Sequence, residues 1–349
     1  MVYFLPWTVS CVLFTSRAGS SILENMSPLR DFIEKLNAEA VFAGQLRYDE
    51  PMAAHTTFKV GGPADVWVQP RGDCFTEYAA ALLRAARAEG IPVFILGGGA
   101  NLVVSDRGIR GIVLDTTGYN EPLTVSSGQL EHRGSVKVPA GMAVDALTDA
   151  LAGEGWGGLE FLAGMPGSVG GAVWMNARCY EKSISDVLME TEILNEHRVI
   201  ERIPFNPSDF DYKRSPFQNR DVLIRAACFR LEKKPLDAIR REMEAHLLDR
   251  KEKGHYRFPS AGSVFKNNRE FGKPTGKIID ELGLRGLQSG GAQVAPFHGN
   301  IIINTGNATA ADIRSLTDTV RGKVRSALGI ELESEILFAG DWGQEPCRR

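Results

Sequence analysis

The sequence has few cysteines and no pattern among them. Cys11, Cys74, Cys179, Cys228 and Cys347 are odd in number and widely scattered, without a CxxC or Cys/His spacing that could close a metal site. We therefore expect no metal ion, and free thiols in a reducing compartment, which indicates a cytoplasmic protein.

The chain also lacks an excess of one charge and a long hydrophobic run. Its 40 Lys and Arg residues are interleaved with 43 Asp and Glu residues, so no basic surface for DNA or RNA is expected. The apolar stretch from Val2 to Phe14 is too short and too polar in its middle to span a bilayer. A signal peptide has a Lys or Arg before its apolar stretch, and none precedes this one. We expect neither a nucleic-acid partner nor a membrane partner.

A length of 349 residues predicts two or three domains, because a single hydrophobic core rarely grows that far. The mixture of helix and strand patterns is that of an α+β protein, and no repeat is evident.

Met26, followed by Ser27 as a helix N-cap and Pro28 in the first turn, is typical of a natural start. Residues 1–25 are therefore expected to be a disordered or adventitious extension.

Hydrophobic periodicity predicts the main elements of the first two thirds of the chain. A helix from Phe75 to Ala88 stops at Gly90, and a short buried strand follows from Val93 to Leu96. Further strands are expected at residues 112–114, 136–138 and 222–231, with a strand pair between 184 and 203.

Lys233-Lys234-Pro235 marks the expected domain boundary, and two amphipathic helices follow it. The second helix is expected to start at a Thr309/Asp312 capping pair and to end at Gly329. The apolar stripes of the two helices comprise Leu236, Ile239, Met243 and Leu247, and then Ile313, Leu316, Val320, Val324 and Leu328.

Two glycine-dense segments are candidates for binding a phosphate-bearing cofactor. Gly97-Gly98-Gly99-Ala100-Asn101 follows an apolar run, and its bare main-chain N–H groups suit a pyrophosphate. It has neither the GxGxxG order nor the GK[ST] of a P-loop, so alone it leaves the ligand undecided. The second segment runs from Gly164 to Ala172, and residues 55–62, HTTFKVGG, are either a plain strand and turn or a further source of hydroxyl and N–H groups.

Three other positions carry chemistry, each with an ordinary structural alternative. Ser263 is either a turn serine or a proton donor, since no GxSxG elbow or His/Asp pair makes it a hydrolytic nucleophile. Strand-like alternation places Glu333 and Glu335 on one face and Ser334 and Ile336 on the other, so the alternative for either glutamate is a solvated surface strand. Lys213 and Arg214 are either surface loop residues or an anchor for a carboxylate or phosphate.

The order of these segments resembles the UDP-N-acetylenolpyruvoylglucosamine reductase family over about residues 27–340. The matching motifs are HTTFKVGGPAD near Thr57, LGGGANLVVSDRGIRG at 96–111, GMPGSVGGAVWMNA at 164–177, FDYKRS at 210–215, AGSVFKN at 261–267, GKIIDELGLRG at 276–286, GGAQVAPFHGNIIIN at 290–304 and LESEI at 332–336.

The resemblance implies an α+β fold with an FAD-binding domain of the vanillyl-alcohol-oxidase (PCMH) type at 26–233, divided into subdomains at about 26–118 and 119–233. A smaller C-terminal α+β domain at 234–349 would bind the UDP-sugar substrate. FAD and NADPH would be the cofactors, the product would be the peptidoglycan precursor UDP-N-acetylmuramate, and the protein would be a monomer. The short interval from Arg214 to Ser263 is similar to the compact class that lacks an inserted tyrosine-bearing loop.

The resemblance also implies residue roles. Ser263 would donate a proton to the reduced substrate, and Glu335 would orient or polarise the substrate carboxylate, itself protonated so as not to repel it. The FAD contacts would be Thr57, Gly97, Gly98, Gly99, Asn101, Leu102, Gly164, Pro166, Gly167, Gly170, Gly171, Ala172 and Asn176. The substrate contacts would be Tyr212, Lys266, Asn267, Gln293, His298 and Asn300.

This chain departs from the family pattern at two places, the expected carboxylate anchor and the residues before Tyr180. The family usually has Tyr-Arg-x-Ser where this chain has Tyr212-Lys213-Arg214-Ser215, so the carboxylate anchor is either Lys213 or Arg214. Arg178 and Cys179 stand where small residues are usual before Tyr180. Two other functions are compatible with the motifs: a flavin-dependent alcohol or sugar oxidase of the same fold superfamily, and a UDP-sugar binding module without catalysis.

Overall fold

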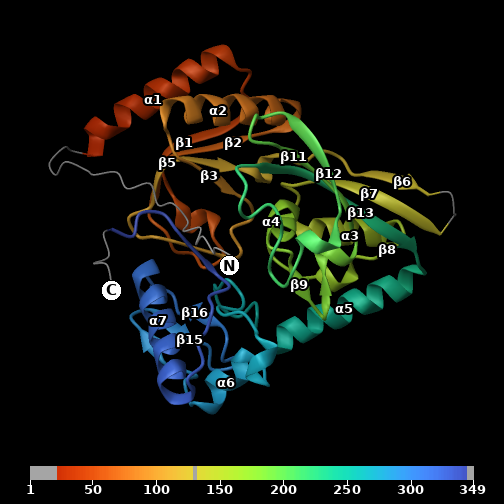
Figure 1. The fold of residues 1–349 in the computed structure, drawn as a ribbon, viewed down its shortest axis with the longest axis vertical. Coiled ribbons are helices and arrows are strands. Elements are labelled where there is room, and N and C mark those ends of the chain that lie inside the picture. Colours follow the sequence, from red (N-terminus) through yellow and green to blue (C-terminus); the bar gives the residue numbers. More distant parts are fainter. Residues whose placement is uncertain (1–21, 129–131, 344–349) are drawn as a thin grey trace, which may run out of the picture.

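Three sheets organise residues 22–128 and 132–343, the part of the chain that the computed structural model describes (Figure 1). The first sheet has the order β1-β2-β5-β3, with β1 antiparallel to β2 and the other two pairings parallel. The elements of this region are α1 (Ile22–Glu39), β1 (Gly44–Pro51), β2 (Pro63–Pro70), α2 (Phe75–Glu89), β3 (Val93–Leu96), β5 (Ile109–Asp115) and, outside the four-stranded sheet, β4 (Leu102–Val104).

Helices α1 and α2 cover one face of this first sheet (Figure 1). Apolar residues of α2 recur at helical spacing, and Phe75, Tyr78 and Leu82 are fully buried against Val66 and Ile112 of the sheet. The helix ends where predicted, because Gly90 turns the chain and donates its N–H to the carbonyls of Ala86 and Arg87.

The second sheet is antiparallel throughout, in the order β12-β11-β13-β7-β6, with β8 beside β13. Its core is formed with α3 and α4, and Phe229 of β13 is fully buried there. The elements are β6 (Thr124–Ser127), β7 (Arg133–Pro139), α3 (Val144–Gly153), β8 (Trp156–Gly157), α4 (Val169–Trp174), β9 (Arg178–Cys179), β10 (Lys182–Ser183), β11 (Leu188–Leu194), β12 (Ile200–Pro204) and β13 (Leu223–Lys233).

The C-terminal part packs a small antiparallel sheet, β14-β15-β16, against α7 (Figure 1). Its core also includes Phe58 and Val60 from the HTTFKVGG segment, so it is continuous with the first part of the molecule. The elements are α5 (Leu236–Glu252), α6 (Thr275–Glu281), β14 (Gln288–Ser289), β15 (Ala292–Val294), β16 (Ile302–Asn304), α7 (Ala310–Leu328) and β17 (Leu337–Ala339).

Two contacts tie the C-terminal part to the first sheet region. β17 pairs in parallel with β4, so the end of the described chain returns to the first sheet region. Asp106, in the loop after β4, accepts hydrogen bonds from the N–H groups of Ala310 and Ala311 at the start of α7, at 2.8 and 2.9 Å. Helix α5, by contrast, buries Ile239 and Met243 against Ala152 and Ala163 of the second subdomain.

The predicted strands at 112–114, 136–138, 184–203 and 222–231 are confirmed as β5, β7, the β11/β12 pair and β13. The Thr309/Asp312 capping box and the Gly329 terminus of α7 are confirmed as well. Cys74, Cys179 and Cys228 are free thiols, whereas Cys11 and Cys347 lie outside the described residues.

Several expectations are wrong in detail. Helix α1 begins at Ile22 rather than at Ser27. Pro28 therefore lies inside the helix, where it removes one main-chain hydrogen-bond donor but does not end the helix. Residues 22–25 of the expected extension are therefore helical, while residues 1–21, including Val2 to Phe14, lie outside the described part.

The burial pattern departs from expectation at the ends of elements. Strand β3 forms an edge of its sheet, which leaves Ile95 38% exposed. Leu236 and Leu328 are 39% and 49% exposed, because the first turn of α5 and the last turn of α7 extend beyond the cores that their helices cover.

We predict that Asp106→Ala lowers the free energy of unfolding by about 1 kcal/mol, because two N–H groups at the start of α7 lose their acceptor. Urea unfolding followed by circular dichroism measures this change. Asp149→Ala, on the exposed face of α3, is the control and is expected to change stability by less than about 0.5 kcal/mol. Equal effects of the two substitutions contradict the capping role.

Candidate functional site

The two glycine-dense segments lie against each other. The Gly98 N–H donates to the Ser168 hydroxyl oxygen at 3.3 Å, and the Gly171 N–H shares that acceptor at 3.3 Å. A Cβ atom on Gly98 would lie 2.6 Å from the Gly167 Cα, so the close approach requires glycine. Ser168 is the N-cap of α4, and sequence reasoning missed its role although a serine before a helical run is an N-cap signal.

The HTTFKVGG segment lies against the same loop. The Thr57 N–H donates to the Gly99 carbonyl at 3.1 Å, and the Thr57 hydroxyl lies 3.5 Å from that oxygen. Gly99 has φ of 61°, and a Cβ there would lie 2.0 Å from the His55 carbonyl oxygen. Thr57 and both glycine-dense segments therefore form one continuous main-chain surface.

This surface fits the pyrophosphate of a dinucleotide. Among the described residues, the main-chain N–H groups of Gly99 and Ala100 donate to no protein acceptor. Such unpaired N–H groups on a glycine loop are the donors that a phosphate anion accepts from.

The other predicted FAD contacts differ in exposure: Gly171 and Pro166 are exposed, whereas Leu102 and Ala172 are buried. Gly170 donates its N–H to the Ala140 carbonyl, and the Gly164 carbonyl accepts a 2.6 Å bond from the Tyr256 hydroxyl.

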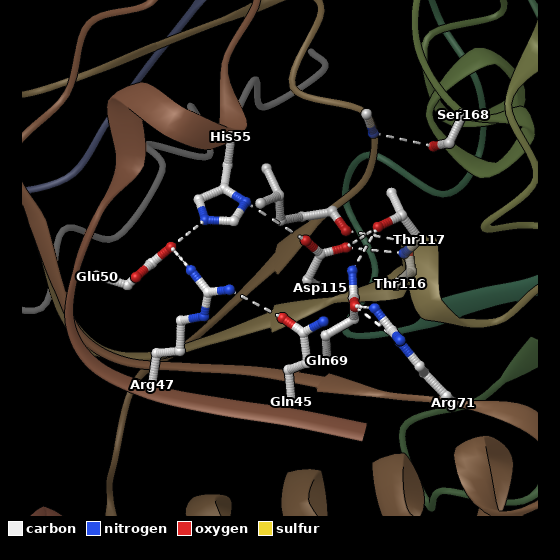
Figure 2. A network of polar contacts seen from close by, with 12 residues as sticks. Gln45, Arg47, Glu50, His55, Gln69, Arg71, Asp115, Thr116, Thr117 and Ser168 are labelled. Carbon is white, nitrogen blue, oxygen red and sulfur yellow. Dashed lines mark hydrogen bonds and ion pairs between the residues drawn. The ribbon is translucent and has the colours of Figure 1, made fainter. Parts of the chain in front are cut away.

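A polar network lies next to the glycine loop (Figure 2). The His55 ring lies between two buried carboxylates, with Nε2 2.8 Å from Glu50 and Nδ1 3.9 Å from Asp115. Burial raises the pKa of the Asp115 carboxyl, while hydrogen bonds from the Thr117 hydroxyl and N–H oppose that rise. The adjacent Thr116 hydroxyl donates to the carbonyl of Leu96, which is the last residue before Gly97. The network is therefore attached to the start of the glycine loop.

Glu335 and Lys213 form a close ion pair, with Lys213 Nζ 2.6 Å from Glu335 Oε1. Glu335 is 8% exposed, so the expected solvated strand face is wrong for this residue. It is correct for Glu333, which is exposed and pairs with Lys266 at 2.5 Å. The segment is an extended loop with an isolated bridge from Ser334 to Phe265 rather than a regular strand, which allows successive glutamates to face different surroundings.

Ser263 lies close to the Glu335 backbone. The Glu335 N–H donates to the carbonyl of Val264, the residue after Ser263, at 2.7 Å. Ser263 itself is half-buried and forms an isolated bridge with Ile301. The structure thus places the residue after Ser263 in contact with Glu335, which pairs with Lys213, while the roles that the resemblance implies for these residues stay predictions.

Lys213, and not Arg214, faces Glu335. Arg214 is exposed and lines a separate polar pocket with Ser208, Asp209 and Asn219. Lys213 has φ of 56°, a left-handed conformation that is unusual for lysine. Asn176 donates to the Asp211 carbonyl at 2.8 Å and Gln218 to the Lys213 carbonyl at 3.1 Å. These two amides hold the turn that directs Lys213, and sequence reasoning missed Gln218.

The expected substrate residues fall into two groups. Tyr212, Lys266 and Asn267 are adjacent, because the Asn267 N–H lies 3.3 Å from the Tyr212 hydroxyl. Gln293 and His298 bond main-chain groups, at Gly286 and Asn300. Burial lowers the pKa of the His298 imidazole.

Asn300 and the residues before Tyr180 contact the protein itself. Asn300 is buried and exchanges hydrogen bonds with the main chain of Phe265 in both directions, so its contacts support the Ser263 segment. Arg178 bonds the Ser183 hydroxyl, and the Cys179 thiol bonds the Phe161 carbonyl.

No group of three or more His, Cys, Asp or Glu side chains among the described residues could hold a metal ion. No helix within the same residues is long and apolar enough to cross a membrane.

Comparison with known proteins matches two family models to this chain. An FAD binding domain model matches residues 76–198, and the C-terminal domain model of UDP-N-acetylenolpyruvoylglucosamine reductase matches residues 254–339. The FAD-binding prediction and the α+β fold, with an FAD-binding domain before a C-terminal domain, are confirmed.

Relatives match over nearly their whole length. The reductases of Treponema denticola and Treponema pallidum are each 40% identical to this chain; the alignments cover 86% and 84% of it, and 95% and 94% of the relatives. The crystal structure of the Thermus caldophilus reductase matches with a TM-score of 0.68 at 29% identity, over 85% of this chain and 99% of that one. The chain therefore belongs to the UDP-N-acetylenolpyruvoylglucosamine reductase family.

Proposed function

We propose that this chain reduces the enolpyruvyl group of UDP-N-acetylenolpyruvoylglucosamine to give UDP-N-acetylmuramate, a peptidoglycan precursor, with Ser263, Lys213 and Glu335 as its catalytic residues. The observation that carries the residue assignment is the convergence of these three, from segments far apart in the sequence, at the Glu335–Lys213 ion pair and the Val264 carbonyl.

FAD, when bound, supplies hydride transfer from NADPH to the methylene carbon of the enolpyruvyl double bond. The N–H groups of Gly99 and Ala100 would hold its pyrophosphate, with Thr57 and the 164–172 segment lining the same surface. Ser168 keeps the two glycine-dense segments together by accepting from both Gly98 and Gly171.

Lys213 would bind the substrate carboxylate and offset the negative charge that develops on the carbon beside it. Glu335 contacts the Lys213 ammonium at 2.6 Å and fixes its position. As a neutral pair, the two residues keep the lysine oriented without repelling the substrate.

Ser263 would then donate its hydroxyl proton to that carbon, which completes the saturated product. Delivery of a hydride to one carbon and of a proton to its neighbour balances the reduction, and the serine regains a proton from solvent. An alcohol can act in this way because the carbanion that it protonates is more basic than the alkoxide it leaves.

We also propose that the protein is a monomer that works in the cytoplasm, where UDP-sugars and NADPH are available. Residues 26–233 would form the FAD-binding region and 234–349 the substrate-binding domain, with α5 as the connection between them. The match of the reductase C-terminal model to residues 254–339 supports this division.

We predict that the purified protein is yellow, that NADPH bleaches the flavin absorbance, and that the enolpyruvyl substrate restores it under anaerobic conditions. Stopped-flow absorbance near the flavin maximum measures both half-reactions. Rapid reoxidation by oxygen with no response to the substrate indicates an oxidase, and a colourless protein indicates a binding module.

Ser263→Ala is expected to leave flavin reduction by NADPH nearly unchanged and to slow substrate reduction by roughly 1000-fold or more, because the proton donor is lost. Ser260→Ala, three residues earlier in the same segment, is the matched control and should leave both rates unchanged within about twofold. An equal loss in both half-reactions of Ser263→Ala shows that Ser263 is structural.

Lys213→Ala is expected to lower kcat/KM for the substrate by about 30- to 100-fold, the effect of a lost charge-assisted hydrogen bond. Arg214→Ala should change it by less than about threefold, because this side chain faces the other pocket. Steady-state kinetics at saturating NADPH distinguish the two. A larger loss from Arg214→Ala than from Lys213→Ala assigns the anchor to Arg214.

A further inference from the structure

Asn101 lies where the cofactor loop joins strand β4, directly opposite the segment that carries Glu335. β4 and β17 pair in parallel, with Leu102 opposite Leu337. The Asn101 side-chain amide donates to the Glu335 carbonyl at 3.0 Å, and the Asn101 carbonyl accepts from the Leu337 N–H at 3.0 Å. One residue of the cofactor loop therefore makes a hydrogen bond on each side of Ile336.

Both main-chain polar groups of Glu335 are fixed by different parts of the site. Its carbonyl accepts from Asn101, and its N–H donates to Val264, the residue after Ser263. The side chain between these two bonds reaches Lys213. The regular pairing of β17 with β4 starts only at Leu337. The Asn101 side-chain amide therefore extends the hydrogen bonding between these two segments back to Glu335.

The geometry of Asn101 differs from that of a cofactor ligand. One N–H of its side-chain amide donates to a protein carbonyl, whereas its main-chain N–H, like those of Gly99 and Ala100, donates to no acceptor among the described residues. Removal of the amide leaves the carbonyl of a buried residue without its donor, and the Glu335 segment loses one of two fixed points. A displacement of about 1 Å at a catalytic group can slow a reaction about 100-fold.

We propose that Asn101 is a positioning residue for Glu335, which fixes the carboxylate and its Lys213 partner relative to the cofactor loop, and that its side chain is not a ligand of FAD. This inference rests on the proposed role of Glu335. It makes Asn101 a residue of the substrate half-reaction, although it lies in the loop that holds the cofactor.

A double-mutant cycle in the full-length holoenzyme tests this. Asn101→Ala and Glu335→Gln are made singly and together, and both half-reactions are measured by stopped flow. The dissociation constant of FAD is measured from flavin fluorescence on reconstitution of the apoprotein. Asn195→Ala, in the distant β11/β12 turn, removes an amide that likewise supports a loop and serves as the control for stability alone.

Asn101→Ala is expected to slow substrate reduction by about 10- to 100-fold in the otherwise natural chain, but by less than about threefold when Glu335→Gln is present. FAD affinity and flavin reduction by NADPH should stay within about threefold of the natural values. Asn101→Asp keeps the shape but places an oxygen against the Glu335 carbonyl, so it should show the same selective loss and provides a second test if the alanine variant fails to fold.

Two outcomes overturn the inference. If Asn101→Ala weakens FAD binding more than about tenfold and slows both half-reactions equally, Asn101 is a cofactor ligand. If its effect on substrate reduction is unchanged by Glu335→Gln, it does not act through Glu335. A normal rate for Glu335→Gln alone instead contradicts the role of Glu335 and is thereby distinguished from a failure at Asn101.

Discussion

The site depends on the main-chain pairing of one extended segment, residues 333–339, with two other parts of the molecule. On one side the Lys266 N–H donates to the Glu333 carbonyl and the Glu335 N–H to the Val264 carbonyl. On the other side β17 pairs with β4, next to the cofactor loop. Hydrogen bonds between main-chain groups fix register independently of side-chain identity, so the segments that carry Ser263, Glu335 and the 97–101 loop are fixed relative to one another.

The features that the sequence predicted correctly are those decided over a few residues. Gly98 and Gly99 are required by close approach and by a positive φ, and the ends of α2 and α7 follow from Gly90, Thr309 and Gly329. Family resemblance supplied the rest of the site, because no local rule links a serine at 263 to a glutamate at 335. The structure links the two segments by main-chain hydrogen bonds, from the Glu335 N–H to the Val264 carbonyl and from the Lys266 N–H to the Glu333 carbonyl.

The features that sequence reasoning could not decide depend on contacts between distant segments. Lys213 rather than Arg214 faces Glu335 because Asn176 and Gln218 hold a left-handed turn there, and alternation alone gives no such turn. The same applies to Glu333 and Glu335, which the strand pattern placed on one face although one is exposed and the other buried. His55 has no signal stronger than an isolated polar residue, and the N-cap signal of Ser168 does not reveal its bond to Gly98, yet both residues support the glycine loop.

The charges at the site give a physical reason for the position of Ser263. In the proposed reaction the ion pair of Lys213 and Glu335 is neutral overall, so the substrate carboxylate would bring the first uncompensated negative charge and hydride arrival would add a second. One lysine cannot neutralise both while it also contacts Glu335. Immediate protonation removes the second charge, and this requires a donor held rigidly beside the ion pair. The Val264 carbonyl, one residue after Ser263, accepts a hydrogen bond from the Glu335 N–H. A movement of Glu335 is therefore expected to move Ser263 with it and to keep the distance between the two residues.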